Sequence, residues 1–208
     1  MYEKALTEEA KKIFSRFGKF KDFYLVGGTA LALQINHRTS VDFDFFSELE
    51  LPVGLLQKVH RVFPDVPIKV TYRVPEQLNV LIDNIKTTFF YFPYPIVEPG
   101  TQYNRVQIAS VPEIAAMKAF SIGKRLSYKD YIDWYFLLHE KYVNLGQVIK
   151  IAREKFNGDF NARLFLGQLV SLEDVPTQEI DFIRDEVGRN EVKKFLENAV
   201  RNFNFKSF

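Results

Sequence analysis

Apolar and polar residues repeat with two different periods along this chain, and the period changes near residue 110. Before that point, short segments alternate between apolar and polar positions, as half-buried strands do, and other segments place apolar residues three or four positions apart, as amphipathic helices do. The alternation predicts strands at residues 23–26, 41–46, 68–74, 77–82, 85–92 and 106–109, with a hairpin turn at 83–84. The helical spacing predicts helices at residues 2–17, 29–36 and 52–63.

From Ser110 onward the pattern is helical. Ser110 followed by Glu113 is a capping-box sequence, which predicts that a helix begins there. Helices are expected at about 111–125, 129–141, 144–156, 161–170 and 179–203. The fold class is therefore α/β (α+β), with an α/β core at residues 1–109 and a C-terminal helical bundle at 110–208. No flexible linker separates the two parts, so we expect the helical domain to pack on the core.

Composition describes a globular chain of 208 residues, 47% hydrophobic and 26% charged. A net charge of +2 is too close to zero to indicate nucleic-acid or membrane binding, and the lack of cysteine excludes disulfides and thiolate metal sites. The 21 Phe and 10 Tyr fit an aromatic core, with base stacking as the alternative. No apolar run approaches the roughly 20 residues of a membrane span and no signal-peptide pattern is present, so a cytoplasmic location is expected.

Gly27-Gly28-Thr29 stands between a predicted strand and a predicted helix. Backbone N–H groups at a helix start point outward at the positive end of the helix dipole, and glycine lets an anion approach the backbone closely. The segment is therefore a candidate phosphate site. The alternative is a tight turn from strand to helix.

Asp42 and Asp44 alternate with Val41, Phe43 and Phe45. In a strand, residues two apart point to the same face, where two carboxylates repel each other and lose hydration. A divalent cation removes both penalties, and hard oxygen ligands suit Mg²⁺, or Mn²⁺ in its place. The alternative is a solvent-facing strand edge with two hydrated aspartates.

A second polar cluster lies in the helical part. Asp130 and Asp133 are three residues apart and share one face of a predicted helix, which Lys129 also begins. The alternative for these acids is favourable interaction with the helix dipole. Lys118 follows two alanines in an otherwise apolar helix, where a lysine at the helix margin could also extend to solvent.

Taken in order, these two clusters resemble the signature of the AbiEii/AbiGii-type toxin nucleotidyltransferases, members of the superfamily built on the DNA polymerase β palm. The first motif of that family is matched by Gly27, Gly28, Thr29, Arg38, Ser40, Asp42 and Asp44. Its later lysine and its Arg-x-x-x-Lys-Asp-x-x-Asp run are matched by Lys118, Arg125, Lys129, Asp130 and Asp133. The resemblance covers about residues 23–138.

The resemblance implies a polymerase-β-like core with a short mixed sheet, followed by the helical bundle. It implies transfer of a nucleotide from an NTP to an acceptor, tRNA or protein among the possibilities, with Asp42 and Asp44 holding Mg²⁺. The implied nucleotide-binding residues are Gly27, Gly28, Thr29, Arg38, Ser40, Lys118 and Lys129. A toxin role would also imply an antitoxin protein as partner.

One departure from the superfamily concerns the third carboxylate that usually stands on a later strand beside the aspartate pair. Thr87 and Thr88 occupy the expected strand, and Asp130 is the first candidate to replace the acid. If no acid replaces it, the chain is a catalytically weakened nucleotide-binding or regulatory module that acts through a partner. Scattered histidines, with no P-loop and no Gly-x-Ser-x-Gly, disfavour a zinc site, a P-loop NTPase and a serine hydrolase.

Overall fold

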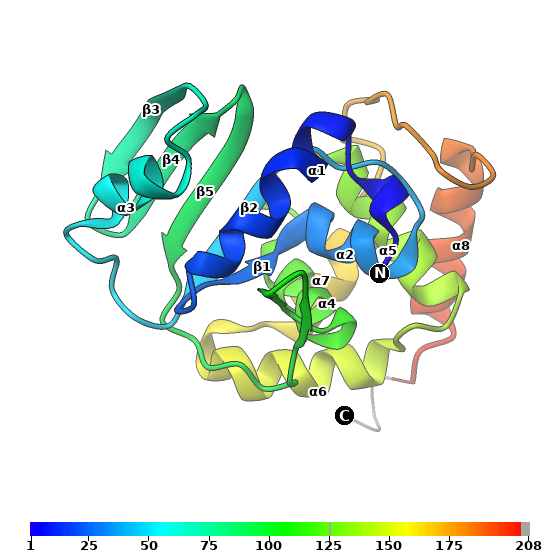
Figure 1. Cartoon of the computed structure of the whole chain (residues 1–208). Helices are drawn as coiled ribbons and strands as arrows, with labels where there is room; N and C mark the ends of the chain where they lie inside the picture. Colours follow the sequence, from blue (N-terminus) through cyan, green and yellow to red (C-terminus); the bar gives the residue numbers. More distant parts are fainter. Residues whose placement is uncertain (125, 205–208) are drawn as a thin grey trace.

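A computed structural model describes residues 1–124 and 126–204 of the chain. Seven strands form one mixed sheet in the order β3-β4-β5-β2-β1-β7-β6 (Figure 1). The strands are β1 (Tyr24–Val26), β2 (Phe43–Ser47), β3 (Ile68–Val74), β4 (Gln77–Ile82), β5 (Ile85–Tyr91), β6 (Thr101–Tyr103) and β7 (Val106–Ile108). The α-helices are α1 (Glu8–Phe14), α2 (Gly27–Ile35), α3 (Leu55–Val62), α4 (Val111–Ser121), α5 (Tyr128–His139), α6 (Leu145–Phe156), α7 (Ala162–Val170) and α8 (Arg189–Arg201).

The centre of the sheet places the first motif between two parallel pairings. β1 pairs antiparallel with β2, whereas β2 pairs parallel with β5 and β1 pairs parallel with β7. The β3–β4 and β4–β5 pairs are antiparallel, and Asp83 and Asn84 form the predicted turn with φ of 51° and 63°. Both angles are left-handed, which Asp and Asn tolerate better than other non-glycine residues.

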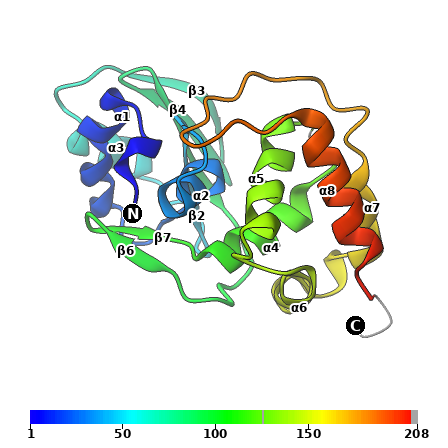
Figure 2. The same ribbon diagram turned by 90° about the vertical axis from the view of Figure 1, so that its right-hand side faces the viewer.

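One face of the sheet carries an aromatic core beneath α1 and α3, which lie together on one side of the sheet in Figure 2. Phe17 is the centre of this core, with its ring centroid 4.7 Å from that of Phe45 and 5.0 Å from those of Phe43 and Phe63. These four rings are at most 1% exposed. The prediction that the phenylalanines build a core is confirmed here, since burying such rings supplies a large share of the hydrophobic free energy.

Helices α4 to α8 lie on the other side of the sheet (Figure 2). Helix α2 contacts both α4 and α5, and a single hydrophobic cluster continues from the sheet into these helices. The helices after residue 110 thus contact the α/β part directly. The division into domains at residue 110 remains a proposal, and it coincides with the start of α4.

Several predicted helices are shorter than expected. The helix predicted at 2–17 is divided into a 3-10 turn at Glu3–Ala5, helix α1, and a second 3-10 turn at Ser15–Lys19. Thr7 causes the first division, because its side chain caps α1 by accepting a hydrogen bond from the Ala10 N–H. The helix predicted from Pro52 begins only at Leu55, and strand β6 was not predicted.

The helix predicted at 179–203 is wrong over residues 179–188. Only residues 189–201 are helical, and the preceding segment crosses to the loop after α2. There the Thr39 N–H donates to the Asp181 carbonyl and the Ile183 N–H donates to the His37 carbonyl. We name residues 181–184 the strap, since they hold the loop at residues 36–39 that carries Arg38. Strand-like bonds of this kind compete with a helix for the same backbone groups.

Candidate functional site

The two glycines form the first turn of α2, rather than preceding it as predicted. Gly27 has a φ of +72°, and a Cβ atom there would lie 2.8 Å from Oδ2 of Asp44. A Cβ on Gly28 would lie 2.6 Å from Nη2 of Arg38. Both contacts are too close for any side chain, so glycine at these positions lets a carboxylate and a guanidinium lie against the backbone of the helix start.

Thr29 fixes the loop that leads to Asp42. Its hydroxyl group donates a short hydrogen bond to the Asp42 carbonyl and lies 2.7 Å from the Ser40 hydroxyl, from which it can accept. The residue is 1% exposed. Its hydroxyl is therefore committed to the loop, and the prediction that this group binds phosphate is not supported by its position.

Asp42 and Asp44 flank the buried Phe43 at the start of β2. Strand β2 begins at Phe43, so Asp42 lies just before the strand and is exposed, whereas Asp44 lies within it and is partly exposed. Because Asp42 is outside the strand, the argument from strand alternation applies to Asp44 alone. Two neighbouring carboxylates, one of them against the Gly27 backbone, supply the hard oxygen ligands that Mg²⁺ prefers.

Strand β5, which pairs with β2, shows which residue stands where the third carboxylate was expected. In the parallel pairing of β2 with β5, Asp44 stands opposite Thr88, while Phe43 stands opposite Thr87. Thr88 is thus the β5 residue beside Asp44, and Thr87 faces the aromatic core, where its hydroxyl has no partner among the described residues. Within residues 1–124 and 126–204, no three His, Asp or Glu side chains converge in a way that could hold a metal ion.

The two motifs meet in a buried ionic network. Nε of Arg38 lies 2.8 Å from Oδ1 of Asp133 and Nη2 lies 3.1 Å from Oδ2, a bidentate geometry. Nζ of Lys118 lies 2.6 Å from Oδ2 of Asp133 and 2.8 Å from Oδ1 of Asp130. All four residues are at most 5% exposed. Helices α4 and α5 therefore hold Arg38 at the start of α2.

Asp133 carries the negative charge on which this network depends. Burial alone would raise the pKa of its carboxyl group, but the Arg38 guanidinium and the Lys118 ammonium hold that pKa well below its usual value. Burial likewise opposes the charge on Lys118, yet Asp133 and Asp130 raise the net pKa of the ammonium. Both groups are charged at neutral pH, which a buried pair requires for its attraction to offset the loss of hydration.

His37, which precedes Arg38 in the sequence, belongs to the same network. Its Nε2 lies 2.8 Å from Oδ1 of Asp133, and its Nδ1 is buried without a partner among the described residues. Burial lowers the pKa of the imidazole, with the nearby cations Arg38 and Lys118 acting in the same direction. The ring is therefore neutral and donates its single proton from Nε2 to Asp133.

Two predicted site residues take positions that differ from the expectation. Lys129 is exposed and, among the described residues, makes no hydrogen bond or ion pair with the network. Lys118 was expected to bind nucleotide, and its ammonium is buried between two aspartates. Asp130, expected to supply the missing acid, is 3% exposed and is paired with Lys118. Arg125 lies outside the described residues.

Comparison with known proteins agrees with these features. Residues 11–108 match the family described as "Nucleotidyl transferase AbiEii toxin, Type IV TA system". The chain is 33% identical over 205 residues to the uncharacterised protein aq_aa25 of Aquifex aeolicus (strain VF5), which covers 94% of this chain and 98% of that protein.

Two solved structures share the fold. A proposed nucleotidyltransferase from H. pylori superposes with a TM-score of 0.58 at 18% identity, over 97% of this chain and 95% of the other. The JHP933 protein of Helicobacter pylori superposes with a TM-score of 0.52 at 17% identity, over 94% and 97%. None of the helices in the described residues combines the length and apolarity that a membrane crossing needs. With its matching sequence, its fold and its ordered motif residues, the chain belongs to the AbiEii family of nucleotidyltransferases.

Proposed function

We propose that the chain is an Mg²⁺-dependent transferase that moves a nucleotide from an NTP to the hydroxyl group of an acceptor. The observation that carries this proposal is the placement of opposite charges at one helix start: the Asp44 carboxylate lies against Gly27, and the Arg38 guanidinium lies against Gly28. Such a site can bind a divalent cation beside phosphate groups. A helix start with its dipole and free N–H groups adds to the affinity for phosphate.

In this proposal Asp42 and Asp44 would hold Mg²⁺ or Mn²⁺, which when bound neutralises charge on the triphosphate. The N–H groups of Gly27 and Gly28 donate hydrogen bonds to phosphate oxygens, and Arg38 attracts the same phosphates from its place beside Gly28. Ser40 and Thr29 keep the Asp42 loop in position through their hydrogen bond. The acceptor oxygen attacks the α-phosphorus and pyrophosphate leaves, so that one phosphoanhydride bond is exchanged for one phosphoester bond.

Thr88 is the observation that favours a second candidate, a weakened nucleotide-binding module. A carboxylate at this position would complete a set of three with Asp42 and Asp44, but a threonine hydroxyl is a weak base and a weak metal ligand. Asp130 is an imperfect replacement, since its carboxylate is already paired with Lys118. We therefore propose slow transfer with ordinary nucleotide binding, in which Lys118 acts by neutralising the two buried aspartates.

The test uses α-labelled NTPs, Mg²⁺ and total cell extract, with the double change Asp42→Asn and Asp44→Asn. Label is expected on an acceptor with the unmodified protein and to be lost with the double variant. Asp83→Asn is the matched control, because it makes the same chemical change in a turn whose left-handed φ suits asparagine. Transfer that persists unchanged in the double variant would place the active site elsewhere.

The biological role that fits this activity is that of a cytoplasmic toxin with a cognate antitoxin, and with tRNA or a protein as acceptor. Its support is the description of the matched family. Growth arrest on expression, relieved by Asp42→Ala and by a gene encoded next to that of the chain, is the expected result. Arrest that persists with Asp42→Ala would separate any toxicity from nucleotide transfer.

A further inference from the structure

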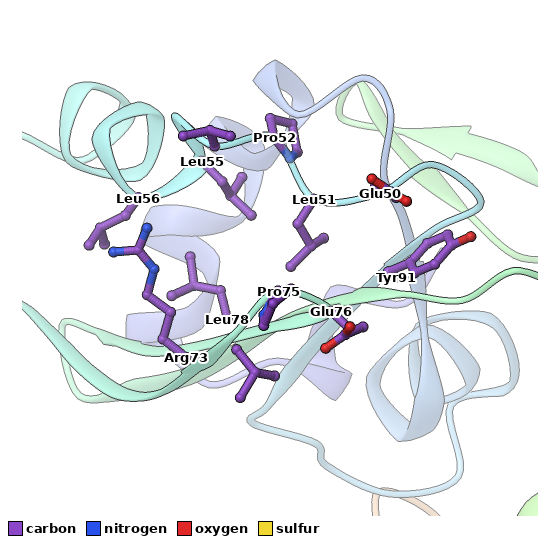
Figure 3. Close-up of a pocket in the computed structure, with 12 residues that line it drawn as sticks. Glu50, Leu51, Pro52, Leu55, Leu56, Arg73, Pro75, Glu76, Leu78 and Tyr91 are labelled. Carbon is purple, nitrogen blue, oxygen red and sulfur yellow. The ribbon is translucent and has the colours of Figure 1, made fainter.

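A cavity of about 620 Å³ lies away from the network, between α3 and the hairpin of β3 and β4 (Figure 3). Leu51, Leu55 and Leu78 form its middle, and Arg73 extends along one end toward Leu56. Glu50, Glu76 and Tyr91 stand at the opposite end. The cavity therefore has an apolar middle, a cationic end beside β3 and an acidic end.

Strand β3 forms the edge of the sheet at this cavity. Among the described residues it pairs only with β4, so the outer backbone groups of its seven residues have no strand partner. The strand contains Lys69 and Arg73 but no acid, and neither cation has a hydrogen bond or ion pair among the described residues. An edge with unpaired N–H and C=O groups is a template for an added strand.

Apolar side chains are also exposed on this side of the molecule. Val53 at the cavity is 92% exposed, and Val70 of β3, which stands opposite the buried Val80 of β4, is 41% exposed. Basic residues and the irregular register between Val70 and Tyr72 are devices that protect an edge from aggregation. Protection alone does not account for exposed apolar residues around an apolar cavity, whereas a docking surface does.

We propose that β3 and this cavity bind an extended segment of a partner protein in which acidic and apolar side chains alternate. The backbone of the segment pairs with β3 near Tyr72–Val74, an acidic side chain meets Arg73, and an apolar side chain enters between the leucines. Charge complementarity selects this occupant. A second copy of the chain would bring its own Lys69 and Arg73 against the same two cations, which opposes pairing of two β3 edges.

The test pans a phage-displayed library of short random peptides against the whole protein. Enriched peptides are expected to alternate acidic and apolar residues, and a synthetic consensus peptide should slow amide hydrogen exchange in Ile68–Val74. Arg73→Glu should weaken the peptide by roughly tenfold or more, and a lysine in place of the acid in the peptide should restore binding. Lys86→Glu, an exposed charge reversal on β5, which β4 separates from β3, is the matched control and should leave the affinity unchanged.

Three results would overturn the proposal: no alternating consensus among selected peptides, a bound peptide that leaves exchange in β3 unchanged, or equal losses from Arg73→Glu and Lys86→Glu. Formation of a dimer that Arg73→Glu disrupts would instead identify a second copy as the occupant, against the proposal. Val53→Glu supplies an independent check of the apolar contact, because this side chain is almost fully exposed and its change should not disturb folding. NTP transfer is expected to be the same in all these variants, so this test is separate from that of the proposed function.

Discussion

Arg38 and Asp133 are 95 residues apart in sequence, yet their side chains form a bidentate ion pair that is closed to solvent. Arg38 belongs to the Gly-Gly-Thr motif and Asp133 to the helical motif. The pair thus brings together two sequence motifs from different halves of the chain. The same carboxylate binds Lys118 and His37, so its loss affects three partners.

Asp133→Asn is expected to destabilise the fold by about 3–5 kcal/mol, because the buried Arg38 loses the carboxylate charge it pairs with and Lys118 retains only Asp130. The free energy of unfolding in urea measures this loss. Asp65→Asn is the matched control: Asp65 also pairs with an arginine, Arg16, but at an exposed position, and its change should have a much smaller effect. Equal effects of the two changes would show that the buried network contributes no more than a surface ion pair.

His37 predicts how stability depends on pH. Burial lowers the pKa of its imidazole below the ordinary 6.5, so the unfolded chain binds a proton that the folded chain does not. Stability should therefore fall as pH decreases from 6.5 toward the folded pKa, by at most about 1.4 kcal/mol per pH unit from this residue. His37→Gln should flatten the slope in urea denaturation between neutral and mildly acidic pH. His60→Gln, on the exposed surface of α3, should leave it unchanged.

Gly27→Ala is expected to remove nucleotide binding while the protein still folds. An alanine at φ +72° costs about 1–2 kcal/mol in backbone conformation, and its Cβ would displace the Asp44 carboxylate. Calorimetric titration with each NTP and Mg²⁺ measures the loss. Gly54→Ala provides the control, since a Cβ there meets no atom within 4 Å. NTP affinity that survives Gly27→Ala would show that the helix start is not where the phosphates bind.

Thr88→Asp tests whether the missing acid limits the site. The added carboxylate would stand beside Asp44, so repulsion should lower the Tm in EDTA, and Mg²⁺ should raise it more than in the unmodified protein. Thr88→Asn has nearly the same shape without the charge and should show no added response to Mg²⁺. Faster NTP transfer by Thr88→Asp would support the proposal that Thr88 weakens the site. A Tm that does not change when Mg²⁺ is added would argue against metal binding beside Asp44.

The outer strands could be predicted from sequence alone because their alternation is regular. Strands β3 and β4 have the predicted bounds, and the Asp83-Asn84 turn follows from residues that tolerate left-handed angles. The predicted helix at 179–188 was wrong because the apolar residues of this segment also fit a helical period. Ile180 and Phe182 in fact pack on the core from an extended segment. Hydrogen bonds to the distant residues 36–39 keep this segment extended, and a local sequence pattern holds no information about such long-range pairing.

The candidate site could be predicted in its membership but not in its contacts. The resemblance to the family motifs identified Arg38, Lys118, Asp130 and Asp133, which the structure brings together. The sequence could not show that Asp133 forms ion pairs with both Arg38 and Lys118, since that depends on how α5 approaches α2. Nor could it show that the Thr29 hydroxyl is used internally, because a threonine after two glycines is equally compatible with phosphate binding.

The strap gives the order in which the site can be assembled. Arg184 donates from Nε to the Asn36 carbonyl across 148 residues of sequence, at 2.9 Å, and Thr39 and His37 are held by bonds to the same segment. Contacts so distant along the chain close late, after the intervening segments have folded. During synthesis, the glycines, the aspartates and Asp133 emerge from the ribosome before residue 184. Until residue 184 emerges, the loop that carries Arg38 lacks its hydrogen bonds to the strap. Nucleotide binding should thus begin only after residues 181–184 have emerged and bound the loop at residues 36–39.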